Sequence, residues 1–202
     1  MEYKTRIFVD FWNFQLNWNH RSSDNINWTK LPNVLIDKTR TITSHFIDQD
    51  DICFEEMRVY ASIDKNNSKE VNLNKWLNDF LDLQPGFGVF IRERKSKQKQ
   101  IHCKKCSDTF SICPKCKSDL KVSSEKGVDA AVITDLFSLY LEDAYNIGIL
   151  LSSDSDYIPA VEKLQDKGIK IVNAGWKNYG YELSKKCWAS FHMDDLIEQI
   201  KR

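Results

Sequence analysis

The sequence is poor in the residues that loosen a chain, with only seven glycines and four prolines among 202 residues. Long disordered linkers are rich in such residues, so we do not expect them here. No run of about 18 apolar residues occurs, which argues against a membrane-spanning helix. The first residues lack the organisation of a signal peptide. We therefore expect a cytoplasmic protein with no membrane partner.

The composition suits a folded domain, because 42% of the residues are hydrophobic and 12% are aromatic. A chain of 202 residues fits one domain with an insertion better than two full domains. We place the domain at residues 1–94 and 122–202 and the insertion at residues 95–121.

Charge is unevenly distributed, although the 29 basic and 29 acidic residues cancel. Residues 92–126 contain eleven basic and four acidic residues, a net charge of +7, so the remainder carries −7. A basic appendage on an acidic body can still bind a polyanion, so zero net charge does not exclude a nucleic-acid partner.

Short apolar runs alternate with amphipathic segments along most of the chain. The apolar runs predict strands at 6–10, 54–63, 88–94, 147–153 and 169–174. The amphipathic segments predict helices at 31–47, 69–82, 125–143, after Pro159, at 179–187 and at 193–201, with residues 11–28 a loop that becomes a helix. This alternation predicts an α/β fold: a three-layer α/β/α, Rossmann-like domain with a parallel central sheet.

Several aspartates fall where such a sheet binds ligands, at the carboxyl ends of its strands. Asp10 ends the first predicted strand, Asp154 and Asp156 follow the fourth, and Asp129 lies on the helix between. Carboxylates in one crevice repel each other unless a cation lies between them, and their hard oxygens select Mg²⁺ or Mn²⁺. The pattern predicts a metal site that activates water for attack on phosphorus. A plainer interpretation is that these aspartates only cap helices and turns.

Three segments of the chain that contain these aspartates together resemble the NYN domain, a branch of the PIN-like nuclease superfamily. Within this branch they are most similar to the LabA-like bacterial members. They are Ile7–Asn13 (IFVDFWN), Lys126–Asp135 (KGVDAAVITD) and Ile149–Pro159 (ILLSSDSDYIP). The similarity extends over residues 5–92 and 124–175. It implies a Rossmann-like fold and metal-dependent hydrolysis of RNA phosphodiesters.

The resemblance also implies roles for single residues. The metal ligands would be the catalytic aspartates Asp10, Asp129, Asp154 and Asp156. Asn13 would position substrate or metal-bound water. Ser152 and Ser153 stand where the family often has Ser-Gly, and Ser152 would support the metal ligands. Asp135 matches a family position but lies about 600° round the helix from Asp129, so we expect it to act from behind the ligands. Lys126 would contact a phosphate or be a solvated lysine at a helix start.

Four cysteines predict a zinc site within the insertion. Two C-x2-C pairs are separated by six residues: Cys103, Cys106, Cys113 and Cys116. Four thiolates satisfy tetrahedral Zn²⁺ with no open position, so we expect a structural zinc ribbon, which His102 flanks. Cys53 and Cys187 are predicted to be buried small hydrophobes.

Basic residues accompany this ribbon, and we expect them to form a lip that draws RNA, or DNA, over the acids. They are Arg92, Arg94, Lys95, Lys97, Lys99, Lys104 and Lys105. The alternative is a charged, solvated excursion. Trp12 and Trp18 are the aromatic residues best placed to stack on bases.

Taken together, the sequence predicts a Mg²⁺- or Mn²⁺-dependent nuclease, an endoribonuclease that uses water as its nucleophile. The alternative is a non-catalytic module on a nuclease fold that binds nucleic acid or protein. A phosphatase is disfavoured because Asp10 is followed by Phe-Trp-Asn and not by the Asp-x-Thr of an aspartyl-phosphate enzyme. The choice of RNA, the number of catalytic metals and a homodimer stay open.

Overall fold

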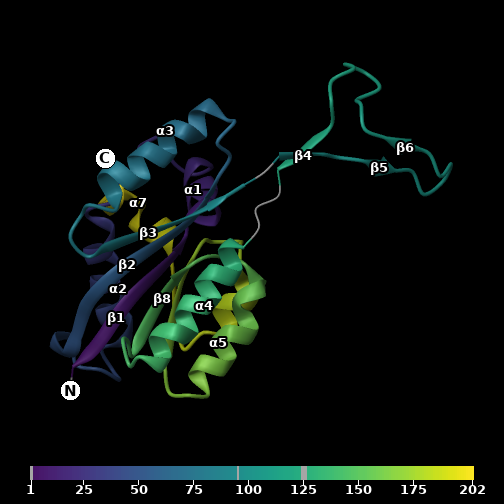
Figure 1. Cartoon of the computed structure of the whole chain (residues 1–202). Helices are drawn as coiled ribbons and strands as arrows, with labels where there is room; N and C mark the ends of the chain where they lie inside the picture. The colour runs from purple at the N-terminus through teal and green to yellow at the C-terminus, as the bar shows by residue number, and fades with distance from the viewer. Residues whose placement is uncertain (1, 95, 124–126) are drawn as a thin grey trace.

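The computed structural model describes residues 2–94, 96–123 and 127–202, of which 96–97 and 121–123 are described by their backbone only (Figure 1). Its body is one six-stranded sheet in the order β10-β9-β8-β1-β2-β3, in which every neighbouring pair is parallel. The strands are β1 (Tyr3–Asp10), β2 (Ile52–Ile63), β3 (Phe87–Glu93), β8 (Ile147–Leu151), β9 (Lys170–Gly175) and β10 (Ala189–His192). The predicted α/β fold with a parallel central sheet is confirmed, and β10 is a strand that was not predicted.

Helices cover both faces of this sheet. One face carries α1 (Phe11–Asn19), α2 (Leu31–Thr43), α3 (Ser68–Trp76) with its π-helical continuation η2 (Leu77–Leu81), and α7 (Ile197–Ile200). The other carries α4 (Val128–Leu141), α5 (Ile158–Gln165) and α6 (Tyr181–Lys186). Short 3-10 turns complete the fold: η1 (Gln49–Asp51), η3 (Ser155–Tyr157) and η4 (Met193–Leu196). None of the helices in the described part of the chain has the length and apolar character needed to cross a bilayer.

Two apolar cores result from the alternation of side chains along each strand. On β1, Ile7 and Val9 belong to the core beneath α1, α2 and α3, whereas Phe8 belongs to the core beneath α4 and α5. All three side chains are fully buried. The continuous apolar run in the sequence therefore reflects a strand that is covered on both faces.

The strand order reverses between β1 and β8. From β1 the chain adds β2 and β3 on one side, and after α4 it adds β8, β9 and β10 on the other. At such a switch point the connections leave in opposite directions, and the crevice between them is the usual ligand site of an open α/β sheet. Asp10 ends β1, and the acidic segment follows β8, so both lie at this crevice.

Two helix starts differ from the prediction. Helix α1 begins directly after Asp10 and not after a loop, because the Asp10 carboxylate accepts a hydrogen bond from the Asn13 backbone N–H (3.3 Å) and caps the helix. Helix α4 begins at Val128 after Gly127, whose φ of 84° suits glycine. Its N-cap is therefore Gly127, three residues later than the predicted start of the helix at 125 allows. Cys53 and Cys187, predicted to be buried, are only half-buried.

The insertion forms an arm of two small antiparallel sheets, in which β4 (Ser96–Gln98) pairs with β7 (Lys121–Ser123) and β5 (Ile101–His102) pairs with β6 (Thr109–Phe110). Figure 1 shows this arm extending away from the α/β body. None of its described strands joins the six-stranded sheet. The six-stranded sheet of the body is therefore formed without any described strand of the arm.

Candidate active site

Asp10 is the best-anchored of the predicted acids. It is 5% exposed at the end of β1, and its Oδ1 caps α1. Its Oδ2 lies 3.4 Å from the Ser152 hydroxyl and 3.4 Å from the Tyr157 hydroxyl, both of which donate to it. These three hydrogen bonds hold the Asp10 carboxylate in a fixed orientation.

Tyr157 joins Asp10 to a second acid. Its hydroxyl lies 3.1 Å from Asp129 Oδ1, so carboxylates from β1 and from the first turn of α4 meet at one buried oxygen. Burial and the negative charges of Asp10 and Asp129 raise the pKa of Tyr157 far above its ordinary value. The phenol therefore stays protonated and can donate to the acids at any physiological pH. The sequence interpretation missed Tyr157, although its place directly after Asp154-Ser-Asp156 was an available signal.

The segment after β8 places Asp154 beside this pair. Its backbone N–H donates to the Ser152 hydroxyl (3.2 Å), and its carboxylate accepts from the Asp156 N–H (2.9 Å) and so caps η3. The charge of Asp154 also contributes to the raised pKa of Tyr157. Asp156 is exposed. Asp154 therefore does cap a helical turn, as the plainer interpretation of the sequence predicts, but capping does not neutralise its carboxylate.

Asn13 connects the two sides of the switch point. Its side-chain oxygen accepts a hydrogen bond from the Ser153 N–H (2.9 Å), which ties the first turn of α1 to the segment after β8. The structure thus brings Asp10, Asn13, Asp129 and Ser152 into one connected hydrogen-bond network through Tyr157 and Ser153.

The donors at this edge are of the type that hard divalent cations bind. Asp10 and Asp129 offer carboxylate oxygens on either side of one hydroxyl, and Asp154 lies on the adjoining turn. Among the described residues, no three His, Cys, Asp or Glu side chains are gathered closely enough to form a complete ligand set. The chemistry of the donors fits Mg²⁺ or Mn²⁺, and the assembled pair is Asp10 with Asp129.

Asp135 points away from the acids, as its place on the helix predicts. Its Oδ2 accepts hydrogen bonds from the Arg58 guanidinium (2.8 Å) and the Tyr60 hydroxyl (2.7 Å) on β2. Burial and the neighbouring Asp135 raise the pKa of Tyr60. Asp135 therefore fixes α4 against the sheet, which sets the position of Asp129 two turns earlier on the same helix.

The predicted basic residues of the body separate into two groups. Arg92 is exposed and lines a pocket of about 370 Å³ beside Gly127, at the start of the helix that carries Asp129. Arg94, predicted to contact phosphate, is instead only 14% exposed because it pairs with Glu70 (2.5 Å) and lies over the Trp12 ring (5.3 Å). Lys95 and Lys126 lie outside the described residues, and only the backbone of Lys97 is described.

The basic residues of the arm surround its cysteines. Lys99, Lys104 and Lys105 are exposed. Two tight turns form around Cys103 with Cys106 and around Cys113 with Cys116, closed by N–H bonds from Ser107 to Cys103 O (2.8 Å) and from Lys117 to Cys113 O (2.9 Å). The two pairs do not come together as one four-cysteine group in the described structure.

Hydrogen bonds within each turn favour the thiolate form of the cysteines. The backbone N–H groups of Cys106 and Lys105 lower the pKa of Cys103, and the Ser118 hydroxyl lowers the pKa of Cys116 to about 7. Thiolate is the form that binds Zn²⁺. Each turn thus favours ionised sulfur at one of its cysteines.

The two tryptophans predicted to stack on bases differ in accessibility. Trp18 is fully buried, and its indole N–H donates to the Asp24 carbonyl (2.7 Å), so the prediction for Trp18 is wrong. Trp12 is half-buried, and its indole N–H donates to the Ser62 carbonyl at the end of β2 (2.7 Å). Of the two rings, only Trp12 remains open to a ligand.

Comparison with known proteins bears on the family and the fold. The model of a family described as the NYN domain matches residues 4–194. No curated protein matches the chain. The crystal structure of a protein of unknown function from Vibrio parahaemolyticus RIMD 2210633 is similar, with a TM-score of 0.56 and 17% identity over 96% of this chain and 94% of that one. At this identity the likeness shows the fold alone.

Proposed function

The chain belongs to the NYN domain family, whose fold is that of the PIN-like nucleases, and from this premise we propose that it is a metal-dependent ribonuclease. The observation that supports the proposal most directly is the meeting of Asp10 and Asp129 at the Tyr157 hydroxyl, with Asp154 on the next turn. These acids come from separate elements and meet at the switch point of the sheet, where such folds bind ligands.

In this proposal Asp10, Asp129 and Asp154 hold a Mg²⁺ or Mn²⁺ ion, and Asp156 lies at the rim. When bound, the cation supplies positive charge that activates a water for attack on the phosphodiester and stabilises the leaving oxygen. Asp10 is fixed for this task by the start of α1 and by Ser152. Asn13 holds the segment after β8 in place through Ser153.

The arm, in the same proposal, is a zinc ribbon that guides RNA. Its two cysteine turns would bind one Zn²⁺ between them, which requires the turns to approach each other when the metal enters. A short segment without a core of its own gains its folding free energy from such a metal. The exposed Lys99, Lys104 and Lys105 then offer positive charge to the phosphates.

Metal content tests the zinc proposal independently of activity. The purified chain should hold about one Zn²⁺, because four thiolates complete one tetrahedral site. Cys103→Ser should lose most of this zinc, whereas Cys53→Ser, outside the arm, should keep it. Equal zinc in both variants, or none in the wild type, would refute the ribbon.

Cleavage assays test the nuclease proposal. Labelled RNA and DNA are incubated with the protein in Mg²⁺, in Mn²⁺ and in EDTA, beside Asp10→Asn, Asp129→Asn and the control Asp166→Asn. Asp166 is exposed after α5, so its amide should leave cleavage unchanged. The two site variants should lose at least about 100-fold in rate. Cleavage by all variants alike would refute the site, and no cleavage by the wild type would favour a non-catalytic binding module.

A further inference from the structure

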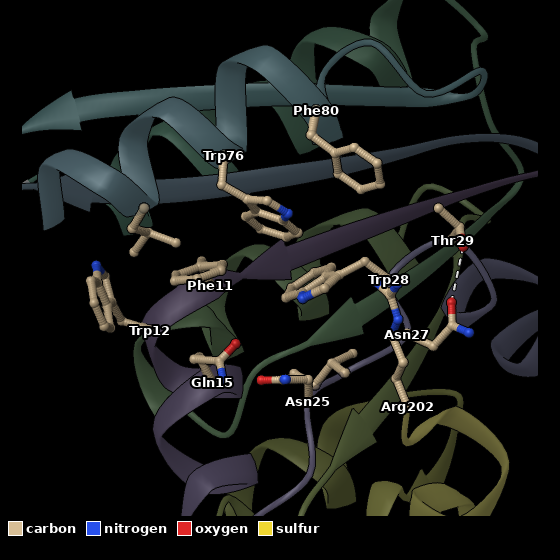
Figure 2. Close-up of a pocket in the computed structure, with 12 residues that line it drawn as sticks. Phe11, Trp12, Gln15, Asn25, Asn27, Trp28, Thr29, Trp76, Phe80 and Arg202 are labelled. Atoms are coloured by element: carbon tan, nitrogen blue, oxygen red, sulfur yellow. Dashed lines mark hydrogen bonds between the residues drawn. The ribbon is translucent and has the colours of Figure 1, made fainter. Parts of the chain in front are cut away.

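A second pocket lies at the start of α1, the helix that Asp10 caps, on the face of the sheet that α1 and α3 cover. It has a volume of about 450 Å³ and is formed by four segments: α1, residues 25–29, α3 with η2, and Arg202. Figure 2 shows Trp76 and Phe80 pointing from α3 and η2 toward Phe11 and Trp28, with Gln15 and Asn25 on the opposite side. Pockets of this size accept small organic ligands.

Aromatic rings form most of its wall, in a connected series. Phe11 stacks on Trp28 with ring centroids 5.7 Å apart, Trp28 meets Trp76 edge to face at 6.0 Å, and Trp76 stacks on Phe80 at 6.0 Å. Trp12 joins the series through Phe11 at 5.2 Å. Phe80 is 41% exposed, and Trp12 and Trp76 are half-buried, so ring faces remain accessible from the pocket.

The polar groups of the pocket favour ligands that carry hydrogen-bonding groups beside an apolar face. The Asn25 amide makes no side-chain hydrogen bond in the described structure, and Gln15 uses only its Nε2, toward Asn19 (2.8 Å). A purely apolar ligand would strip water from these groups without replacing it. A planar ligand with donors and acceptors along its edge would satisfy them while its face stacks on the rings.

Charge and position narrow the ligand further. Arg202 is the one charged residue among those that line the pocket, so its charge attracts an anion. Trp12 and Gln15 follow Asp10 by two and five residues, which places them about 3 Å and 7.5 Å along the axis of α1. The wall of the pocket therefore includes the helix that Asp10 caps.

From these observations we infer that the aromatic pocket binds one unpaired nucleobase of a single-stranded RNA. The base stacks against the accessible rings of Trp76 and Phe80. Its edge meets Asn25 and Gln15, and Arg202 faces the adjoining phosphate. This inference rests on the proposed nuclease function, because it treats the bound base as part of the strand that lies over Asp10. A base held in a duplex cannot enter, so the pocket selects unpaired nucleotides.

Binding of a fluorescent single-stranded RNA octamer tests the inference without added Mg²⁺ or Mn²⁺, with the Asp10→Asn variant so that the strand stays intact. A series of octamers with one abasic position each is compared with the intact strand. The Asp10→Asn variant should bind at least one abasic strand about fivefold more weakly, as expected for the loss of one stacked base. Equal affinity for every abasic strand, or no binding of the intact strand, would overturn the pocket.

Matched variants, each combined with Asp10→Asn, locate the effect. Phe80→Leu, in the pocket, should weaken binding about fivefold and abolish the abasic penalty. The control Phe46→Leu makes the same change at a ring that is 77% exposed and pairs with Trp188 outside the pocket, so it should bind as Asp10→Asn alone does. Asn25→Ala, at an exposed loop residue, gives a second pocket variant with the fold intact. If Phe80→Leu and Asn25→Ala kept the full penalty, the base would lie elsewhere.

The result is separable from the nuclease proposal. Cleavage in Mn²⁺ that depends on Asp10, together with a flat abasic series, would refute the pocket and leave the nuclease standing. An abasic penalty that Phe80→Leu removes, without cleavage by the wild type, would support the pocket and refute the nuclease.

Discussion

At the scale of single residues, Tyr157 determines how close the two acids come. Its buried hydroxyl lies between Asp10 and Asp129 and stays protonated because burial and both charges raise its pKa. The hydroxyl partly compensates two negative charges that would otherwise face each other. A cation at the same place would do so more strongly.

Tyr157→Phe should therefore lower the stability of the metal-free protein by about 1.5–3 kcal/mol, the usual contribution of a hydrogen bond to a charged group. With saturating Mg²⁺ the difference should shrink, because the ion takes over the compensation. Thermal unfolding with EDTA and with Mg²⁺ measures both values. The control is Tyr145→Phe, which removes a hydroxyl that donates to the Leu136 carbonyl (2.8 Å). A Tyr157 deficit that Mg²⁺ leaves unchanged would contradict this role.

Gly180 acts at the same scale on the segment after β8. Its φ is 69°, and a Cβ at this position would lie 2.6 Å from Ser153 Cα. Gly168 also has a positive φ, of 91°, but a Cβ there would meet nothing within 4 Å. The two glycines thus separate backbone strain from steric contact.

Gly168→Ala should lose about 1 kcal/mol through strain alone, and Gly180→Ala should lose more, up to about 3 kcal/mol. Gly180→Ala should also reduce cleavage, because Ser153 would move and break its hydrogen bond to Asn13. Urea unfolding and cleavage rates measure the two effects. Equal losses in both variants would show that the contact with Ser153 is unimportant.

At the scale of elements, a helix or strand could be predicted when residues within the segment itself determine its structure, and not when contacts with distant segments do. The runs around Ile7 and Ile149 form buried strands, and their apolar character alone indicates this. β10 was missed because only Phe191 of its four residues is buried, so its pairing with β9 leaves little trace in the sequence. The early start of α1 depends on Asp10 acting as a cap, which the Asn-rich sequence obscures.

The candidate site was predictable in part for the same reason. Asp10 and Asp154 follow apolar strands, and the sheet then brings them to one edge. The aromatic pocket could not be predicted, because Trp28 and Trp76 meet only when α3 packs over the loop after α1. The sequence predicts Arg94 to be an exposed basic residue, and only the fold shows that it forms an ion pair with Glu70.

The loop after β9 is tied to the loop after α1 by Asp194. Its carboxylate accepts from Arg21 Nε (2.8 Å) and from the Lys177 N–H (2.8 Å). Burial opposes its charge, but these donors prevail and lower the pKa of Asp194 below its ordinary value. A lowered pKa in the folded state means that the stabilisation is present above the unfolded pKa and is lost as pH falls through the folded one.

Asp194→Asn should therefore reduce the melting temperature at pH 7, and the difference should shrink steadily below about pH 4, as the pH approaches the lowered pKa of the wild-type carboxyl. Thermal melts from pH 7 to pH 3 measure this. Asp37→Asn, at an exposed carboxylate on α2, is the control and should show little change at any pH. A constant deficit for Asp194→Asn down to pH 3 would exclude the ion pair as its cause.

At the scale of the whole molecule, charge and shape are divided between an acidic body and a basic arm. The arm's exposed Lys99, Lys104 and Lys105 offer phosphate contacts away from the acids, and none of its described strands joins the sheet. Affinity for long RNA and the chemistry at the acids should thus be separable.

Replacing Lys99, Lys104 and Lys105 by Gln should weaken binding of long RNA and reduce the slope of log affinity against log salt by about 2. The melting temperature of the body should stay the same. The control replaces Lys4, Lys163 and Lys167, which are exposed toward the opposite edge of the sheet, where β1 begins and α5 ends. Salt titrations of both triple variants measure the slopes. If the two variants had equal slopes, the lysines of the arm would be solvated charges that do not bind RNA.

The pairing at the base of the arm has a consequence for how this protein could diversify. Ser96 pairs with Ser123 and Gln98 with Lys121, so the chain leaves the arm beside the place where it enters. The two ends of the insertion are therefore as close together as the ends of a short loop, whatever the length of the arm between them. Descendants could exchange, enlarge or lose the arm while inheriting the acidic centre without alteration.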